Sequence, residues 1–388
     1  MNFELSDEQA AIKEAIKRIC NRFNDNYWKE KDLTGQFPFE FHEAISNDGW
    51  LGIAMPEEFG GSGLGITDAA LMMETISASG AGFSGASAIH MNIFGLNPVV
   101  VYANSEQKKR WLPPLIAGQD LACFGVTEPN TGLNTAHLKT KARRVNDEYI
   151  VSGQKIWIST AQVATKILLL ARTAPIEDTA NPIDGLTLFY TDVDRKKMSI
   201  HEIEKMGRKA VDSNQIFIDD LRIPLCDRIG EEGKGFRYIL DSLNPERILV
   251  AAEAVGLGQI ALDKAVKYAG ERIVFNRPIG KNQSIQHPLA LRWIELEAAR
   301  LLTYKAASLY DLGKPCGAES NAAKYFAGEA GFKACETSIL THGGMGYAKE
   351  FHVERYFRES MIPRIVPVSS QLILCFIAER VLGMPKSY

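Results

Sequence analysis

Cysteine is scarce in this chain, and long apolar runs are missing from it. The six cysteines among the 388 residues are scattered, with no Cys-x-x-Cys pair and no histidine at the spacing of a zinc site. We therefore expect free thiols and no bound metal. No segment approaches the roughly 18 consecutive apolar residues of a membrane-spanning helix, and no cationic and apolar targeting peptide is visible at the N-terminus. We expect no contact with a membrane, and a place in the bacterial cytoplasm or, after trimming, in an organellar matrix.

A strong excess of charge is also lacking. The formal net charge is -3, with 23% charged and 46% hydrophobic residues, which is ordinary for a globular protein. Nucleic acid is therefore not an expected partner, because its phosphates attract proteins with a clear basic surplus. At this length the chain can bury a large core in two or three structural layers.

The hydrophobic pattern changes twice along the chain. The first part has apolar residues at helical spacing, for example Ala10, Ile12, Ala15, Ile16 and Ile19. Short β-type runs follow at residues 149–151, 155–158, 167–170, 186–190 and 215–218. Long helical patterns then return. We predict an α+β fold with an N-terminal α-helical domain (1–119), a middle β-sheet, barrel-like domain (120–227) and a C-terminal four-helix-bundle domain (228–388).

One glycine-rich run, residues 60–65 (GGSGLG), invites comparison with a dinucleotide-binding loop. No predicted strand precedes it, and its glycines do not have the Gly-x-Gly-x-x-Gly spacing. We interpret it as a turn before a helix that begins near Thr67. Nothing else in the sequence favours a nicotinamide site.

Two motifs carry a more specific signal. Residues 123–132 (CFGVTEPNTG) precede residues 156–160 (IWIST), and this pair resembles the flavin-binding segments of the acyl-CoA dehydrogenase family. A tryptophan beside a serine on a strand is by itself unremarkable, but two such motifs in family order are specific. The resemblance implies FAD, whose flat ring needs an apolar wall and a few fixed donors. It implies flavin contacts at Phe124, Val126, Thr127, Trp157 and Ser159.

The resemblance extends over nearly the whole chain, through residues 55–61, 105–114, 229–236, 272–283 and 342–347. It implies that one subunit reaches the FAD of its neighbour, and hence a homotetramer built as a dimer of dimers. The implied contacts across subunits are Arg272, Phe275, Gln283, Gly343 and Gly344, and Ser369 and Gln371 would contact FAD near the C-terminus. Leu340 and Leu133 depart from the family pattern, each at the expected cost of one polar contact.

The catalytic carboxylate is missing from its usual place. In the family it stands within a Tyr-Glu-Gly-Thr run, which here matches residues 366–369 (VPVS), so that Pro367 replaces the glutamate. The backbone N–H of that residue usually binds the thioester carbonyl, and proline has none. Losing one such donor costs about 2.7–4 kcal/mol in comparable enzymes. The substrate is therefore expected to sit differently here or to find another donor.

Some family branches carry the base on a C-terminal helix, directly before an arginine. Here that position is Glu246, in residues 243–247 (LNPER). We expect a helix to begin at Asn244, with Pro245 in the first turn and Glu246 near the positive end of the helix. The resemblance implies that Asn244 and Arg247 contact the pantetheine and the CoA phosphate. Glu253, about two turns further on, is a weaker candidate and more typical of a polar contact between helices.

The resemblance predicts α,β-dehydrogenation of an acyl-CoA, with Glu246 as the base and electrons passed to electron-transferring flavoprotein. Two alternatives remain open at this point. One is an oxidase or monooxygenase of the same fold that uses oxygen directly. The other is a non-catalytic protein that binds flavin or acyl-CoA, an alternative that Pro367 favours and Glu246 opposes.

Overall fold

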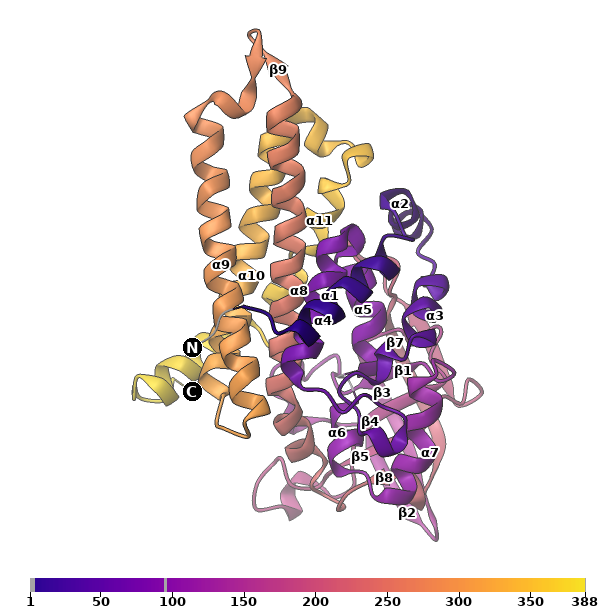
Figure 1. Ribbon diagram of the computed structural model, residues 1–388. Helices are drawn as coiled ribbons and strands as arrows, with labels where there is room; N and C mark the ends of the chain where they lie inside the picture. The colour runs from indigo at the N-terminus through magenta and orange to yellow at the C-terminus, as the bar shows by residue number, and fades with distance from the viewer. Residues whose placement is uncertain (1–3, 94–95, 388) are drawn as a thin grey trace.

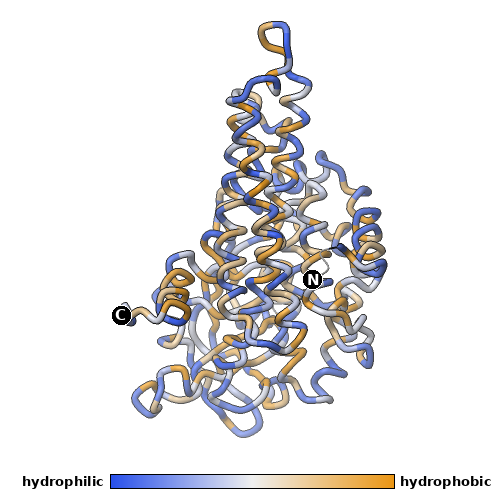
Figure 2. Tube along the Cα trace, turned by 60° about the vertical axis from the view of Figure 1, so that its left-hand side comes forward, coloured by the Kyte–Doolittle hydropathy of each residue, from blue (hydrophilic) through white to orange (hydrophobic). Residues whose placement is uncertain are grey.

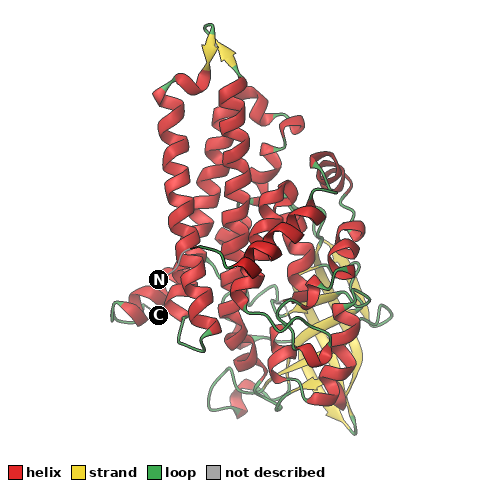
Figure 3. Cartoon of the chain, viewed as in Figure 1, coloured by secondary structure: helices red, strands yellow, loops and turns green. Residues whose placement is uncertain are grey.

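Helices flank a β-sheet along the chain, and the predicted α+β class with helical N- and C-terminal parts is confirmed. The computed structural model describes residues 4–93 and 96–387. The long C-terminal helices stand together on the left of Figure 1, and the sheet lies at lower right beneath the N-terminal helices (Figures 1 and 3).

The N-terminal part is helical from its first described turn. Ser6 caps α1, because its hydroxyl accepts from the backbone N–H of Gln9 while the Gln9 side chain accepts from the N–H of Ser6. The predicted stripe of α1 is buried at Ile12, Ile16 and Ile19. The helices are α1 (Asp7–Cys20), α2 (Asp25–Thr34), α3 (Phe39–Asn47), α4 (Ile66–Ile76), α5 (Gly82–Ile93), α6 (Asn97–Tyr102) and α7 (Ser105–Ile116).

The middle part is one eight-stranded sheet in the order β6-β7-β3-β2-β4-β5-β8, with β1 paired to β4. All five predicted β-type runs lie in its strands, and the runs at 149–151 and 155–158 belong to one strand, β3. The strands are β1 (Ala122–Gly125), β2 (Lys141–Val145), β3 (Glu148–Ser159), β4 (Lys166–Arg172), β5 (Leu186–Asp192), β6 (Met198–Glu202), β7 (Ser213–Pro224) and β8 (Arg228–Ile229).

Three long helices build the C-terminal part. They are α8 (Gly235–Glu271), α9 (Gln283–Asp311) and α10 (Gly317–His342), and a hairpin of β9 (Ile273–Val274) and β10 (Arg277–Pro278) joins α8 to α9. Figure 1 shows this hairpin at the far end of the bundle. The chain then continues through α11 (Val353–Glu359), α12 (Ile362–Ile365), α13 (Ser370–Phe376) and the π-helical turn η10 (Ile377–Val381).

The expected helix start at Asn244 is wrong. Helix α8 begins at Gly235 and runs through Pro245, which lies inside it. A proline inside a helix removes one backbone hydrogen bond, and here the surrounding packing tolerates that loss, since Pro245 itself is buried. Glu246 therefore lies about three turns after the start of a long helix, away from the helix's positive end.

One helical stretch of the described residues, Val353–Val381, is long and apolar enough to cross a membrane by length and composition alone. It consists of the short pieces α11 to α13 and η10, and Pro363 and Pro367 lie within it. Figure 2 shows hydrophobic residues in the coil beside the C-terminus, where the chain stands off the body. One such stretch is weak support for a membrane span, because exposed apolar surface also serves contacts between subunits.

Candidate functional site

A cavity of about 350 Å³ lies where the sheet, α8 and the C-terminal segment meet. Its walls are mostly apolar, with few polar groups, which is typical of a site for an organic ligand. The lining includes Phe124, Val126, Thr127, Leu133, Phe236, Leu240, Glu246, Arg247, Asn321, Pro367 and Val368. The structure thus brings three predicted features to one cavity. They are the first flavin-binding segment (residues 123–132), the predicted base Glu246, and Pro367, which replaces the usual base.

Hydrogen bonds join the two sequence motifs directly. The N–H of Ile156 donates to the carbonyl of Thr127 at 2.9 Å. The Lys155 ammonium, fully buried, donates to the carbonyl of Val126 at 3.0 Å and to the Glu128 carboxylate at 2.9 Å. Strand β3 therefore holds the loop that follows β1.

The Lys155–Glu128 pair fixes that loop from inside. Burial lowers the pKa of Lys155 to about 8 against the opposing effect of Glu128. Burial alone would raise the pKa of Glu128, but Lys155 and bonds from the backbone of Lys139 and Thr140 bring it below its ordinary value. A buried carboxylate with this many donors is held in one geometry. The sequence motif thus contains its own anchor, which the sequence reasoning did not single out.

The residues around these motifs suit a flat ring system such as FAD. Phe124, Val126 and Thr127 line the cavity, and the Trp157 side chain is 58% exposed at a positive φ of 62° in an irregular part of β3. The hydroxyl of Thr131 is buried with no hydrogen-bond partner among the described residues. The cavity thus offers a flat ring an apolar wall, whereas Trp157 and Thr131 lie outside its lining.

Ser159 has a partner that the sequence did not suggest. Its hydroxyl accepts from Arg208 Nη2 at 2.8 Å, and the same guanidinium also donates to Ser87 and Ser213 at 3.3 Å. Burial lowers the pKa of Arg208 from its ordinary value, although Glu253 acts to raise it. The predicted flavin contact at Ser159 thus lies beside a buried cation.

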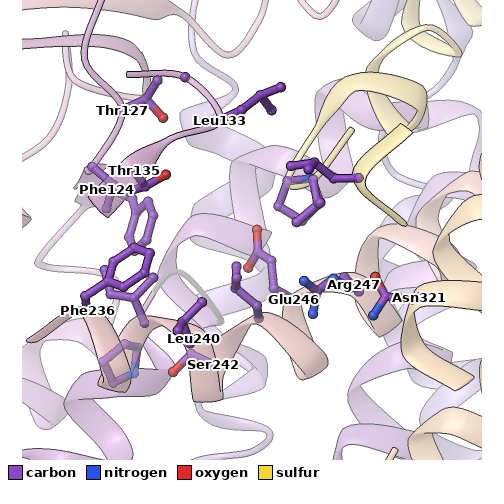
Figure 4. A pocket seen from close by; sticks show the side chains of 18 of the residues that line it. Phe124, Thr127, Leu133, Thr135, Phe236, Leu240, Ser242, Glu246, Arg247 and Asn321 are labelled. Carbon is purple, nitrogen blue, oxygen red and sulfur yellow. The ribbon is translucent and has the colours of Figure 1, made fainter. Parts of the chain in front are cut away.

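Glu246 projects from α8 into the cavity (Figure 4). Figure 4 shows Arg247 and Asn321 on one side of it and Phe124 and Phe236 across the cavity. Its side chain is 23% exposed, so the carboxylate is partly shielded from water. The predicted base therefore faces the space where a ligand would bind, in a setting that is mostly apolar.

The carboxylate of Glu246 pairs with a histidine from α5. Glu246 Oε2 lies 3.0 Å from His90 Nε2, and the other ring nitrogen, Nδ1, lies 2.6 Å from Glu253 Oε1. Burial alone would lower the pKa of His90, but the two carboxylates raise it well above its ordinary value. The two carboxylates thus favour the imidazolium form of His90. Sequence reasoning expected a polar contact between helices at Glu253 but did not identify its partner.

Arg247 lies on the same cavity wall. Its Nη1 donates to the Asn244 side-chain oxygen at 3.2 Å. Burial lowers the pKa of Arg247 to about 10, although the neighbouring Glu246 raises it. Its Nε is buried with no hydrogen-bond partner in the described part of the chain. The guanidinium thus has one buried donor atom, Nε, with unused capacity.

The segment that carries Pro367 is tied to α10. The buried Lys324 side chain donates to the carbonyl of Val368 at 2.5 Å, and burial followed by the charge of Arg247 lowers the pKa of Lys324 to about 8. Ser369 caps α13, its hydroxyl accepting from the N–H of Leu372 at 3.3 Å, and Gln371 is exposed. Ser369 and Gln371 thus stand next to the cavity lining without forming part of it.

The remaining predicted FAD contacts lie at the opposite end of the bundle. Arg272, Phe275 and Gln283 are exposed on and beside the hairpin, with the Phe275 side chain 93% exposed. Tyr268 at the end of α8 stacks on His342 at the end of α10, with ring centroids 4.3 Å apart. This contact places Gly343 and Gly344 at the same end, where a side chain on either glycine would meet nothing within 4 Å.

None of this group lines the cavity of its own chain, and Figure 1 shows the hairpin at the far end of the bundle. Leu340, on the last turn of α10, is exposed, and Leu133 is exposed at the cavity rim. Two groups of predicted cofactor contacts therefore exist, one at the cavity and one at the tip of the bundle.

Comparison with known proteins gives a consistent result. The models named acyl-CoA dehydrogenase N-terminal, middle and C-terminal domain match residues 6–119, 123–221 and 233–382. A Mycobacterium bovis protein, acyl-CoA dehydrogenase fadE12, is 35% identical, covering 100% of this chain and 99% of that protein. A Bacillus subtilis protein, probable acyl-CoA dehydrogenase YngJ, is 36% identical over 98% of this chain and all of its own length.

A solved structure gives the same relation in three dimensions. A glutaryl-coenzyme A dehydrogenase in complex with glutaryl-CoA is similar with a TM-score of 0.94 and 30% sequence identity, covering 100% of this chain and 98% of that one. The predicted resemblance is thus confirmed over the whole chain.

Proposed function

Because this chain belongs to the acyl-CoA dehydrogenase family and is an FAD-dependent oxidoreductase of that family, we propose that it dehydrogenates an acyl-CoA thioester between the α and β carbons with Glu246 as the base. The observation that carries the proposal is the place of Glu246. It is the one acidic side chain among the residues lining the described cavity, and Pro367 lines the same cavity without a carboxylate.

The chain's own residues have distinct tasks in this proposal. Phe124, Val126, Thr127, Trp157 and Ser159 would hold the flavin ring, with Ser369 and Gln371 nearby. FAD supplies the acceptor for the β hydride when it is bound. Glu246 would take the α proton, for which a carboxylate held in a largely apolar cavity is suited.

Asn244 and Arg247 would bind the substrate. Pro367 offers no N–H to the thioester carbonyl, so its oxygen must be bound by other donors. The buried Nε of Arg247, without a partner in the described chain, supports a role in binding an oxygen of the substrate. The mostly apolar wall of the cavity supports an acyl chain as the part that enters it.

The second group of cofactor contacts supports an oligomer. Arg272, Phe275, Gln283, Gly343 and Gly344 would reach the FAD of a neighbouring subunit, since they lie at the far end of the bundle from their own cavity. Helix α9 exposes Leu291, Trp293, Ile294 and Leu301, and apolar surface of this kind is costly unless a partner covers it. We propose a homotetramer, a dimer of dimers, placed in the cytoplasm, with electron-transferring flavoprotein as the electron acceptor.

The test is anaerobic mixing of the purified flavoprotein with a panel of short, branched and long acyl-CoA thioesters. Reduction bleaches the flavin absorbance near about 450 nm, a general property of flavins. We expect at least one thioester to bleach the flavin and electron-transferring flavoprotein to restore the absorbance. If every thioester leaves the absorbance unchanged, the proposed function is wrong. Rapid reoxidation by air with release of hydrogen peroxide would instead support an oxidase.

A further inference from the structure

The base proposed above is the outermost of three ionisable groups in a row, the other two of which are buried. The Glu246 carboxylate meets His90 at 3.0 Å, and His90 meets Glu253 at 2.6 Å. His90 and Glu253 are both buried, with side chains 6% and 2% exposed. Glu253 does not line the cavity, and Glu246 does. The outer carboxylate is therefore available to a ligand, while the inner one is reserved for the histidine.

The Glu253 carboxylate affects the protonation of His90. Burial acts to lower the pKa of His90, and the charge of Glu246 and then that of Glu253 oppose this effect. With a carboxylate on each ring nitrogen the pKa of His90 lies well above its ordinary value, which favours the imidazolium form. The three groups would then carry one net negative charge together, and the ring N–H of His90 fixes the orientation of the Glu246 carboxylate.

Further charged residues lie around the trio of Glu246, His90 and Glu253. Arg208 lies close enough for Glu253 to raise its pKa, and Arg247 for Glu246 to do the same. From α11, Glu359 accepts from the N–H of Phe83 at the start of α5 and pairs with Arg355. These contacts fix the helix that carries His90, and the two arginines place positive charge near the carboxylates of the trio.

We propose that His90, held between Glu253 at 2.6 Å and Glu246 at 3.0 Å, is a positioning residue that directs the Glu246 carboxylate into the cavity and favours its ionised form. This inference rests on the proposed function, because it assigns His90 a role through the proposed base. It differs from a purely structural contact between α5 and α8. A structural contact would affect folding and stability, whereas a positioning residue also sets the pH range in which the base works.

The test measures the rate of anaerobic flavin bleaching by acyl-CoA across about pH 5 to 9, a range that spans histidine titration. The enzyme is kept at neutral pH and jumped to each pH on mixing, so that slow unfolding does not contribute. His90→Gln keeps a side-chain N–H toward Glu246 but removes the charge. We expect the acid limb of the rate profile to move up by about 1 pH unit or more, the usual effect of losing an opposite charge at this distance.

Below that limb, each unit of displacement lowers the rate about tenfold relative to the parent protein. Glu253→Gln leaves the imidazole with a neutral partner, so we expect a new dependence on pH as His90 loses its proton within the range measured. His42→Gln is the matched control, since His42 is also a buried histidine but pairs with Asn92 in place of a carboxylate. It should leave the limb where the parent protein has it.

The outcomes separate the two proposals. If a thioester bleaches the parent protein and His90→Gln has the parent's acid limb, His90 is not the positioning residue, and the proposed function stands. If no thioester bleaches the parent protein, both proposals fail. Rates are compared at equal flavin content, and if His90→Gln does not retain FAD, Glu253→Gln decides in its place, with an unchanged profile refuting the inference.

Discussion

Replacing Glu246 by glutamine tests the chemistry separately from the fold. The amide has nearly the same shape and can still accept from His90, so the contact at 3.0 Å is weakened and not lost. The amide cannot take a proton at neutral pH. We therefore expect acyl-CoA binding to persist while the rate of flavin bleaching collapses.

For Glu246→Gln the expected loss of rate is much larger than the expected loss of stability. A general base contributes about 10²–10⁴ in rate, which is about 2.7–5.4 kcal/mol of barrier. Glutamine keeps a hydrogen bond to His90, and His90 keeps its pair with Glu253, so the expected loss of stability is about 1 kcal/mol. Activity should thus fall by at least about a hundredfold with only a small shift of the thermal midpoint.

Glu253→Gln provides the matched comparison on the same helix. The Glu253 side chain is 2% exposed, and removing one partner of a buried pair costs up to about 3–5 kcal/mol. Stopped-flow bleaching and thermal unfolding of both variants at equal flavin content supply the two readouts. The reasoning is refuted if Glu246→Gln bleaches at the parental rate, or if it loses more stability than Glu253→Gln.

Three further predictions concern the loop anchor, the N-terminal core and the assembly. Lys155→Met leaves the Glu128 carboxylate buried without its cation, so we expect a loss of stability of about 3–5 kcal/mol. FAD should also be released more readily during gel filtration, and undiminished retention of FAD would contradict this prediction. His42 has a pKa lowered by burial from 6.5 to about 4, so the unfolded state binds more protons, and stability falls as pH drops through about 6.5 and levels off near 4. Denaturant unfolding of His42→Gln should show a smaller loss of unfolding free energy between about pH 6.5 and 4 than the parent protein, by at most about 3 kcal/mol. If stability depends on pH as in the parent protein, the lowered pKa of His42 is wrong. Ile294→Asp puts a charge on the exposed apolar face of α9, and sedimentation should show a species smaller than the parent oligomer, whereas equal mass would argue that this face is not an interface.

The parts of the fold that could be predicted are those with local signals. Five β-type runs lie in strands of the sheet, and the stripe through Ile12, Ile16 and Ile19 is buried in α1. The two motifs around Thr127 and Trp157 are joined by a backbone bond between Ile156 and Thr127. Each of these depends on hydrophobic periodicity or on a short motif, both of which can be read over a few residues.

The parts that could not be predicted depend on contacts over long separations. His90 and Glu253 are 163 residues apart, and nothing near His90 in the sequence marks it as a partner of a carboxylate. The expected helix start at Asn244 failed for a related reason. Asn-Pro-Glu is a good local start signal, but α8 continues through it because tertiary packing outweighs local preference.

The most direct measurement of the central claim is a structure of the FAD-loaded protein with a bound, unreactive acyl-CoA analogue. The account predicts a Glu246 carboxylate oxygen about 3–3.5 Å from the α carbon, the spacing of reacting groups in a productive complex. His90 should then lie on the far side of that carboxylate, still paired with Glu253. An α carbon that faces another acidic side chain, with Glu246 turned away from the ligand, would contradict the account.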